Sequence, residues 1–138
     1  MTKKIEYYEV EREPEFSKGV RWLAKKKRFV SLPGQLLGLE ADLSKGSFPG
    51  DLISRREAPV LHEVYKLRLP NPDTNVGKSN GYRIIYIVVT ERKVVVLLTI
   101  YYKKEDETVT DTFIDGLIAG YFLDDVPYDD EETNQDAE

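Results

Sequence analysis

The sequence predicts a single α+β domain with a small antiparallel sheet, in the element order β-α-α-β-β-β-α. Apolar residues recur at helical spacing between positions 14 and 44, and after Pro59 the pattern changes to a period of two. Helical spacing returns between Thr110 and Leu123. At 138 residues the chain has the length of one domain and can bury its own core.

The N-terminal part is expected to hold a short strand at Glu6–Val10, followed by two helices. The first helix begins at Pro14 and the second runs from Gly34 to Ser44, so that a Pro–Gly turn joins them into an antiparallel hairpin. We interpret Trp22 as a packing residue between these helices. The apolar stripes expected to face the core are Phe16, Val20, Leu23 and Ala24 on the first helix and Leu36, Leu37, Leu39 and Leu43 on the second.

Three strands and a final helix are expected after a loop at residues 47–51. Residues 62–69 alternate as in a strand with one exposed face. Two β-branched runs, Gly81–Thr90 and Val94–Tyr101, form a hairpin, and the unbroken run in the second indicates a central strand covered on both faces. The final helix, capped by Thr110 or Asp111, should pack through Phe113, Leu117 and Tyr121.

The composition excludes several kinds of site. The chain has no cysteine, which rules out disulfides, thiolate nucleophiles and cysteine zinc sites. Its single histidine, His62, rules out histidine-pair metal sites. His62 is a candidate acid–base group, but we interpret it as a surface or structural residue. Any metal centre would have to rest on carboxylates alone, and we expect no cofactor. The N-terminus shows no signal-peptide pattern and the longest apolar run, Val94–Ile100, is too short to span a bilayer, so we expect a cytoplasmic protein.

The net charge of −5 comes from an acidic C-terminal segment, and the rest of the chain is basic. Residues 124–138 hold eight acidic and no basic side chains, and we interpret them as a flexible acidic tail behind a domain at residues 1–123. That domain has 20 basic against 17 acidic residues, and His62–Lys104 has eight basic against three acidic residues. A locally basic strip of this kind is typical of polyanion binding.

Cations are concentrated near the ends of the predicted strands. Lys66 and Arg68 project from one face of a strand because they are two residues apart, Arg83 opens the next strand, and Lys103 and Lys104 end the one after it. Repulsion among converging cations costs stability, so an anionic ligand is one interpretation; edge charges that discourage sheet pairing are the other. Arg21 and Lys25 belong to a basic helix that either contacts a phosphate backbone or is simply solvated.

Three stretches of the sequence resemble the RelE/HigB toxin family of bacterial toxin–antitoxin systems, and its HigB-like branch most. They are Tyr65–Leu69, Gly77–Tyr86 with its Gly–Lys–Ser–x–Gly–Tyr–Arg–Ile–Ile–Tyr pattern, and Leu97–Glu105 with its Leu–Leu–Thr–Ile–Tyr–x–Lys pattern. The resemblance implies a RelE-like fold and a toxin that enters the ribosome and cleaves mRNA. It also implies an antitoxin protein as partner.

The resemblance implies roles for individual residues, with cleavage through the RNA 2′-hydroxyl and without a metal. By motif, the catalytic residues are Lys66, Arg68, Arg83 and Lys104. The tyrosine that the family places near the last helix falls at Thr110, which leaves Tyr101 or Tyr102 as a substitute. The residues expected to bind RNA outside the catalytic set are Lys78, Lys103, Lys25 and Arg21.

Two other functions stay open from the sequence. The ParE branch shares the fold and is thought to poison DNA gyrase without cutting RNA. An inactive RelE-like protein, whose acidic tail shields the basic face, is the second alternative. The sequence does not specify codon preference, antitoxin or oligomeric state.

Overall fold

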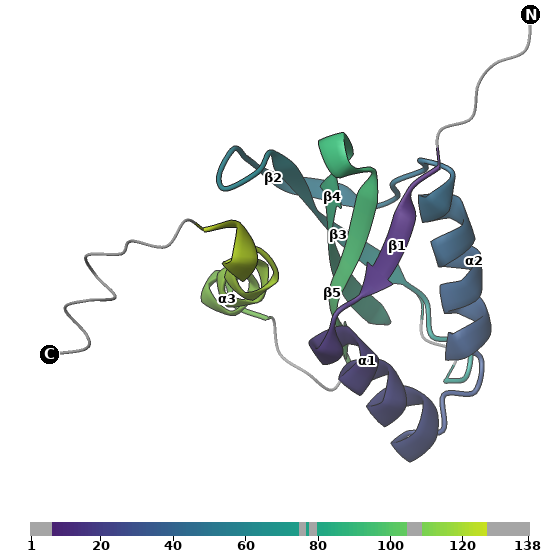
Figure 1. Ribbon diagram of the computed structural model, residues 1–138. Coiled ribbons are helices and arrows are strands. Elements are labelled where there is room, and N and C mark those ends of the chain that lie inside the picture. Colours follow the sequence, from purple (N-terminus) through teal and green to yellow (C-terminus); the bar gives the residue numbers. More distant parts are fainter. Residues whose placement is uncertain (1–6, 75–76, 78–79, 105–108, 127–138) are drawn as a thin grey trace, which may run out of the picture.

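The computed structural model describes residues 7–74, 77, 80–104 and 109–126. A five-stranded sheet lies between two helical layers (Figure 1). Helices α1 (Pro14–Arg21) and α2 (Leu32–Ser44) lie on one side of the sheet, and α3 (Asp111–Tyr121) lies on the other. The predicted α+β class is confirmed.

Most of the sheet is antiparallel, as predicted, and one parallel pair that the sequence did not predict makes it mixed. Its strand order is β1-β5-β4-β3-β2, and β1 (Glu9–Arg12) pairs in parallel with β5 (Val94–Tyr102). The remaining pairs, which involve β4 (Tyr82–Val89), β3 (His62–Leu69) and β2 (Asp51–Arg56), are antiparallel. Strand β1 begins at Glu9, inside the predicted Glu6–Val10, and Glu6 lies outside the described residues.

Strand β2 is an element that the sequence did not predict. It lies at the edge of the sheet, and both Leu52 and Ile53 are exposed. The register with β3 shifts between Leu52 and Ser54. The sequence of the strand also shows no regular alternation of apolar and polar residues. Because periodicity is the main signal for a strand, a short irregular edge strand is invisible in the sequence.

The first helical layer covers one face of the sheet through the predicted residues Phe16, Leu23 and Leu36. Three predictions are wrong here. The Pro–Gly turn does not join the helices, because Pro33 and Gly34 lie in the first turn of α2. Trp22 is 55% exposed, because α1 continues into a π-helical turn, η1 (Trp22–Lys26), that presents Leu23 to the core instead. Leu37 is 68% exposed, since it lies a helical step of about 100° from Leu36.

On the opposite face, α3 packs through a stripe one residue later than predicted: Ile114, Ile118 and Phe122 are buried. Beneath it, His62 is 1% exposed, its ring lies 4.8 Å from that of Phe122, and its Nδ1 is 2.7 Å from the Val60 carbonyl oxygen. One face of β3 was expected to be exposed, but α3 covers that face at His62 and Val64. His62 occupies a core position, in agreement with its interpretation as a structural residue.

The hairpin and the central strand are as predicted. Strands β4 and β5 pair along their length, join through a short 3-10 turn, η2 (Thr90–Arg92), and are buried almost throughout. After α3 the chain makes a second short turn, η3 (Leu123–Asp125), where the Asp125 carboxylate lies 2.7 Å from Arg92. Most of the predicted acidic tail, residues 127–138, lies outside the described part. Within the described ranges, no helix has the length and apolar character needed to cross a membrane.

Candidate functional site

Three strands bring cationic side chains to the same end of the sheet. Strands β3, β4 and β5 are successively antiparallel, so the end of β3, the start of β4 and the end of β5 are neighbours. Arg68 lies directly opposite Arg83, and Arg83 lies directly opposite Tyr101. Residues that are opposite each other project from one face, so these three side chains form a row. Lys66 projects from that face too, two residues before Arg68.

The row lies on the same face of the sheet as α3. It lies beyond the end of the helix, where that face is open. Val64 and Ile85, on the same face, belong to the α3 core, whereas Arg68 is exposed. The first turn of α3 stands beside this open end. The Thr110 side-chain oxygen caps that turn by accepting a hydrogen bond from the Phe113 backbone N–H at 3.1 Å, which confirms Thr110 as the cap.

Lys66 is surrounded by charge. Partial burial lowers the pKa of its ammonium group, and the positive charges of Arg83, Arg68 and Lys103 lower it further, against an opposing effect of Asp111. Lys103 therefore belongs to the same group as the three residues of the strands. We call Lys66, Arg68, Arg83 and Lys103 the cationic cluster.

Arg83 is the buried member of the cationic cluster, with 5% of its surface exposed. Burial lowers the pKa of its guanidinium group, and the charge of Arg68 lowers it further. One Nη donates a hydrogen bond to the Tyr82 carbonyl oxygen at 3.2 Å, which directs the guanidinium group along the start of β4.

Arg68 is the accessible member. Its Nη1 lies 2.9 Å from the Asp51 carboxylate on β2, and the two side chains are 49% and 65% exposed. An ion pair this exposed contributes little to stability. A phosphate can therefore compete with Asp51 for the Arg68 guanidinium group.

Tyr101 adds a phenol to the same row. Burial raises its pKa, while the charge of Arg83 and a hydrogen bond from the Val109 backbone act in the opposite direction. A raised pKa keeps the phenol protonated near neutral pH, so it can donate a proton or a hydrogen bond beside Arg83.

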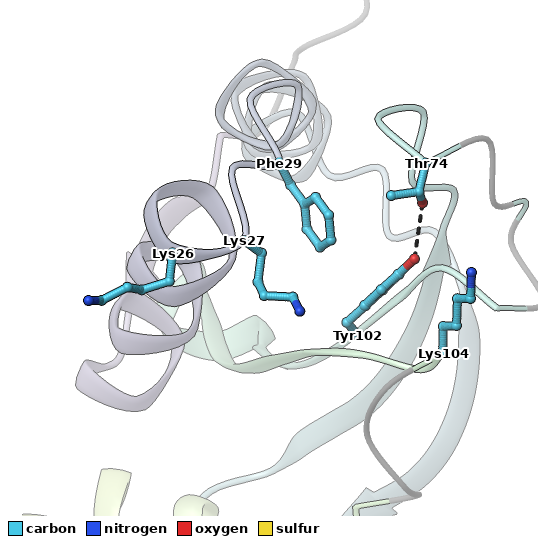
Figure 2. Close-up of a pocket in the computed structure, with 6 residues that line it drawn as sticks. All are labelled: Lys26, Lys27, Phe29, Thr74, Tyr102 and Lys104. Carbon is cyan, nitrogen blue, oxygen red and sulfur yellow. Dashed lines mark hydrogen bonds between the residues drawn. The ribbon is translucent and has the colours of Figure 1, made fainter.

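Tyr102 and Lys104 do not join the cationic cluster, contrary to the expectation that all of the candidate catalytic residues converge. Tyr102 projects from the opposite face, because successive strand residues alternate, and its ring lies 5.1 Å from that of Phe29. Its hydroxyl is 3.0 Å from the Thr74 Oγ1. Lys104 lines a pocket together with Tyr102 (Figure 2).

The remaining predicted RNA-binding residues lie apart from the cluster. Arg21 and Lys25 are exposed on α1 and η1, in the helical layer on the other side of the sheet. Lys78 lies outside the described residues. Among the residues that the structure does describe, no three histidine or carboxylate side chains are grouped as metal ligands.

Sequence reasoning missed the two acidic neighbours of the cluster. Asp51 lies in the unpredicted strand β2, and Asp111 was considered only as a helix cap. The glycine of the Gly–Tyr–Arg motif has a structural reason: a Cβ at Gly81 would overlap the Leu69 carbonyl oxygen, so only glycine lets β3 approach the start of β4.

Among known proteins, similarity to this chain was found only in a comparison of structures. No protein-family model matches the chain, and a search of curated proteins found no match. One similar structure is a mutant of the E. coli toxin RelE in the free state, with 20% identity, a TM-score of 0.49, and coverage of 83% of this chain and 97% of that one. Another is an archaeal RelE–RelB complex from Pyrococcus horikoshii, with 20% identity, a TM-score of 0.38, and coverage of 72% and 99%.

Proposed function

We propose that this chain is a ribonuclease toxin of the RelE/HigB type, which cleaves mRNA on the ribosome and is inhibited by a partner antitoxin. The observation that carries the proposal is the meeting of Lys66, Arg68 and Arg83 on one face at one end of the sheet, with Lys103 beside them. Cations gathered in this way repel one another, and a bound polyanion relieves that repulsion. The motif resemblance of residues 64–105 supports RNA as the polyanion.

The proposed reaction uses the RNA's own 2′-hydroxyl. A base removes its proton, O2′ forms a bond to the adjacent phosphorus, and the bond from phosphorus to the leaving O5′ breaks as that oxygen gains a proton. The products are a 2′,3′-cyclic phosphate and a 5′-hydroxyl, so no water or cofactor is consumed. The protein must supply a base, an acid and positive charge at the phosphorane.

The cationic cluster and Tyr101 offer groups for each task. Lys66 is the proposed base, because the lowering of its pKa increases the fraction that is neutral near pH 7. Arg68 and Arg83 offer forked donors to the phosphate oxygens. The proposed acid is Tyr101 or Lys103. Lys104, which was predicted as a catalytic residue, lies away from the cluster and is proposed as a contact to RNA instead. Acid–base help of this kind accelerates a reaction by about 10²–10⁴-fold, and the ribosome would add the alignment of the RNA.

The test of the proposal is expression in growing cells of the wild type and of Arg83→Ala, with new mRNA ends mapped within translated regions. We expect the wild type to arrest growth and to produce such ends, and Arg83→Ala to lose both, since removing one stabilising donor typically costs about 10²–10³-fold in rate. The matched control is Arg55→Ala, which removes an exposed arginine from β2. It should behave like the wild type.

Two outcomes contradict the proposal. Growth arrest and mRNA cleavage that persist in Arg83→Ala would remove the cationic cluster from the mechanism. Growth arrest by the wild type that comes with gyrase-linked DNA breaks, and without new mRNA ends, would favour the ParE-like alternative.

A further inference from the structure

A second cationic site lies behind the first, on the opposite side of the same sheet end. It is a cavity of about 360 Å³ that we call the lysine pocket, lined by Lys26, Lys27, Phe29, Thr74, Tyr102 and Lys104 (Figure 2). Three of these six residues are lysines and none is acidic. The proposed catalytic chemistry uses none of them as base or acid.

The pocket is built from three separate segments. The η1 turn and the residues after it supply Lys27 and Phe29, the loop after β3 supplies Thr74, and the end of β5 supplies Tyr102 and Lys104. Figure 2 shows the Lys27 ammonium group directed toward the Tyr102 ring, while that of Lys26 points away. Aromatic packing fixes this frame, since the Phe29 ring lies 5.1 Å from that of Tyr102.

Hydrogen-bonding groups accompany the lysines. The Tyr102 hydroxyl and the Thr74 Oγ1 lie 3.0 Å apart, and the backbone N–H of Thr74 donates to the Asn71 carbonyl oxygen at 3.3 Å. Asp73, the nearest acid along this loop, is turned to Ser31, whose backbone N–H and hydroxyl both donate to its carboxylate at 3.0 Å. The negative charge next to the pocket is thus engaged elsewhere.

Two buried polar groups in the same region have no hydrogen-bond partner among the described residues. They are the Tyr82 hydroxyl and the Asn71 Nδ2, and both side chains are fully buried. The Tyr82 ring lies 5.7 Å from that of Tyr102, and Asn71 anchors the loop that carries Thr74. A buried hydroxyl and a buried amide that lack partners cost stability, and they lie just behind the residues that line the pocket.

We propose that the lysine pocket binds a phosphate group of the same RNA strand whose scissile phosphate lies at the cationic cluster. The inference rests on the proposed function, because it takes RNA as the ligand. The end of β5 connects the two sites: Tyr101 and Lys103 serve the cluster, and Tyr102 and Lys104 serve the pocket. An RNA strand that crosses this end of the sheet contacts both, so tight binding requires RNA that extends beyond the bond to be cut.

The test is binding of a fluorescent single-stranded RNA of eight nucleotides with 2′-O-methyl groups, which cannot be cleaved, over a range of salt concentrations. We expect Lys27→Met to weaken binding severalfold at low salt and to reduce the slope of log affinity against log salt by about 0.7, the value for one phosphate contact to a single strand. Lys104→Met should act in the same direction, and Lys27→Arg should restore binding. Lys45→Met, which removes an exposed lysine at the end of α2, should match the wild type.

A dinucleotide provides the second arm, because it is too short to reach both sites. We expect the wild type and Lys27→Met to bind it equally. Equal affinity and slope for the eight-nucleotide RNA would overturn the inference, as would binding of inorganic phosphate at the pocket with no effect of Lys27→Met on RNA. If Lys27 contributes to RNA binding but the wild type cuts no mRNA, the cleavage proposed at the cluster fails, and the contact between the lysine pocket and RNA stands.

Discussion

Arg83 occupies a position that stability alone would not favour. It is 5% exposed and lies directly opposite another arginine, Arg68, across the β3–β4 pair. Burying a charge costs free energy, and the second cation opposite it adds repulsion. The same features suit a group that meets a phosphate, since low solvent exposure strengthens the attraction between opposite charges.

Lys66 provides a prediction on stability and its pH dependence. Its pKa is lowered in the folded protein by burial and by the neighbouring cations. Below that lowered pKa the lysine is charged in both states, and its folded form bears the full cost of burial and repulsion. As pH rises through the lowered pKa toward 10.5, the usual pKa of a lysine, the unfolded chain holds the extra proton and the cost disappears.

We therefore expect Lys66→Met to raise the melting temperature at pH 7, by a small amount because solvent screens a partly exposed lysine, and the gain should shrink as pH increases toward 10.5. Thermal unfolding of the wild type and the variant across this pH range measures the effect. Lys45→Met, at the exposed residue that follows α2, serves as the control for the loss of one lysine. A melting temperature of Lys66→Met that is lower than that of the wild type at pH 7 would contradict the described electrostatics.

Helix α3 packs on one face of the sheet, and its first turn lies near the open end that holds the cluster. Its residue Thr110, at the position where the resembled family has a tyrosine, caps the helix through Oγ1. A threonine engaged as a cap has no phenol to offer, and Tyr101 is the phenol that lies opposite Arg83. Thr110 thus has a structural role as a helix cap, and Tyr101 on β5 could supply the phenol instead.

Removing the cap should loosen this end of the helix. We expect Thr110→Ala to lower the free energy of unfolding by about 1 kcal/mol, and Thr110→Ser to restore most of it, because serine can accept the same hydrogen bond from Phe113. Chemical denaturation of the three proteins measures the difference. If alanine and serine cost the same, the side-chain hydrogen bond does not stabilise α3.

The secondary structure elements were predicted well where a long periodic pattern exists. The hairpin of β4 and β5, the strand β3 and all three helices follow from apolar spacing. The buried stripe of α3 was misplaced by one residue, since Phe113 and Ile114 are both apolar and spacing alone does not choose between them. Strand β2 has neither length nor alternation, and the parallel pairing of β1 depends on β5, about 85 residues away in sequence.

Helices cover both faces of the sheet and leave one end of it open. The sequence could predict that Lys66 and Arg68 share a face, because that follows from strand geometry. It could also place Arg83 near them once β3 and β4 were paired. Which of Tyr101, Tyr102, Lys103 and Lys104 face the cluster depends on the register of β5 and its irregularity near Ile85 and Tyr86, which only the structure specifies.

Cleavage of mRNA on purified ribosomes tests most directly whether the open end of the sheet is the catalytic site. Purified ribosomes stalled on a defined mRNA can be incubated with the wild type, Arg83→Ala and the control Arg55→Ala, and the new RNA ends analysed. We predict cleavage by the wild type and Arg55→Ala that leaves a 5′-hydroxyl and a 2′,3′-cyclic phosphate, with a loss of about 10²–10³-fold in Arg83→Ala. Intact mRNA with the wild type, or equal cleavage by wild type and Arg83→Ala, would contradict the assignment of the cationic cluster as the cleavage site.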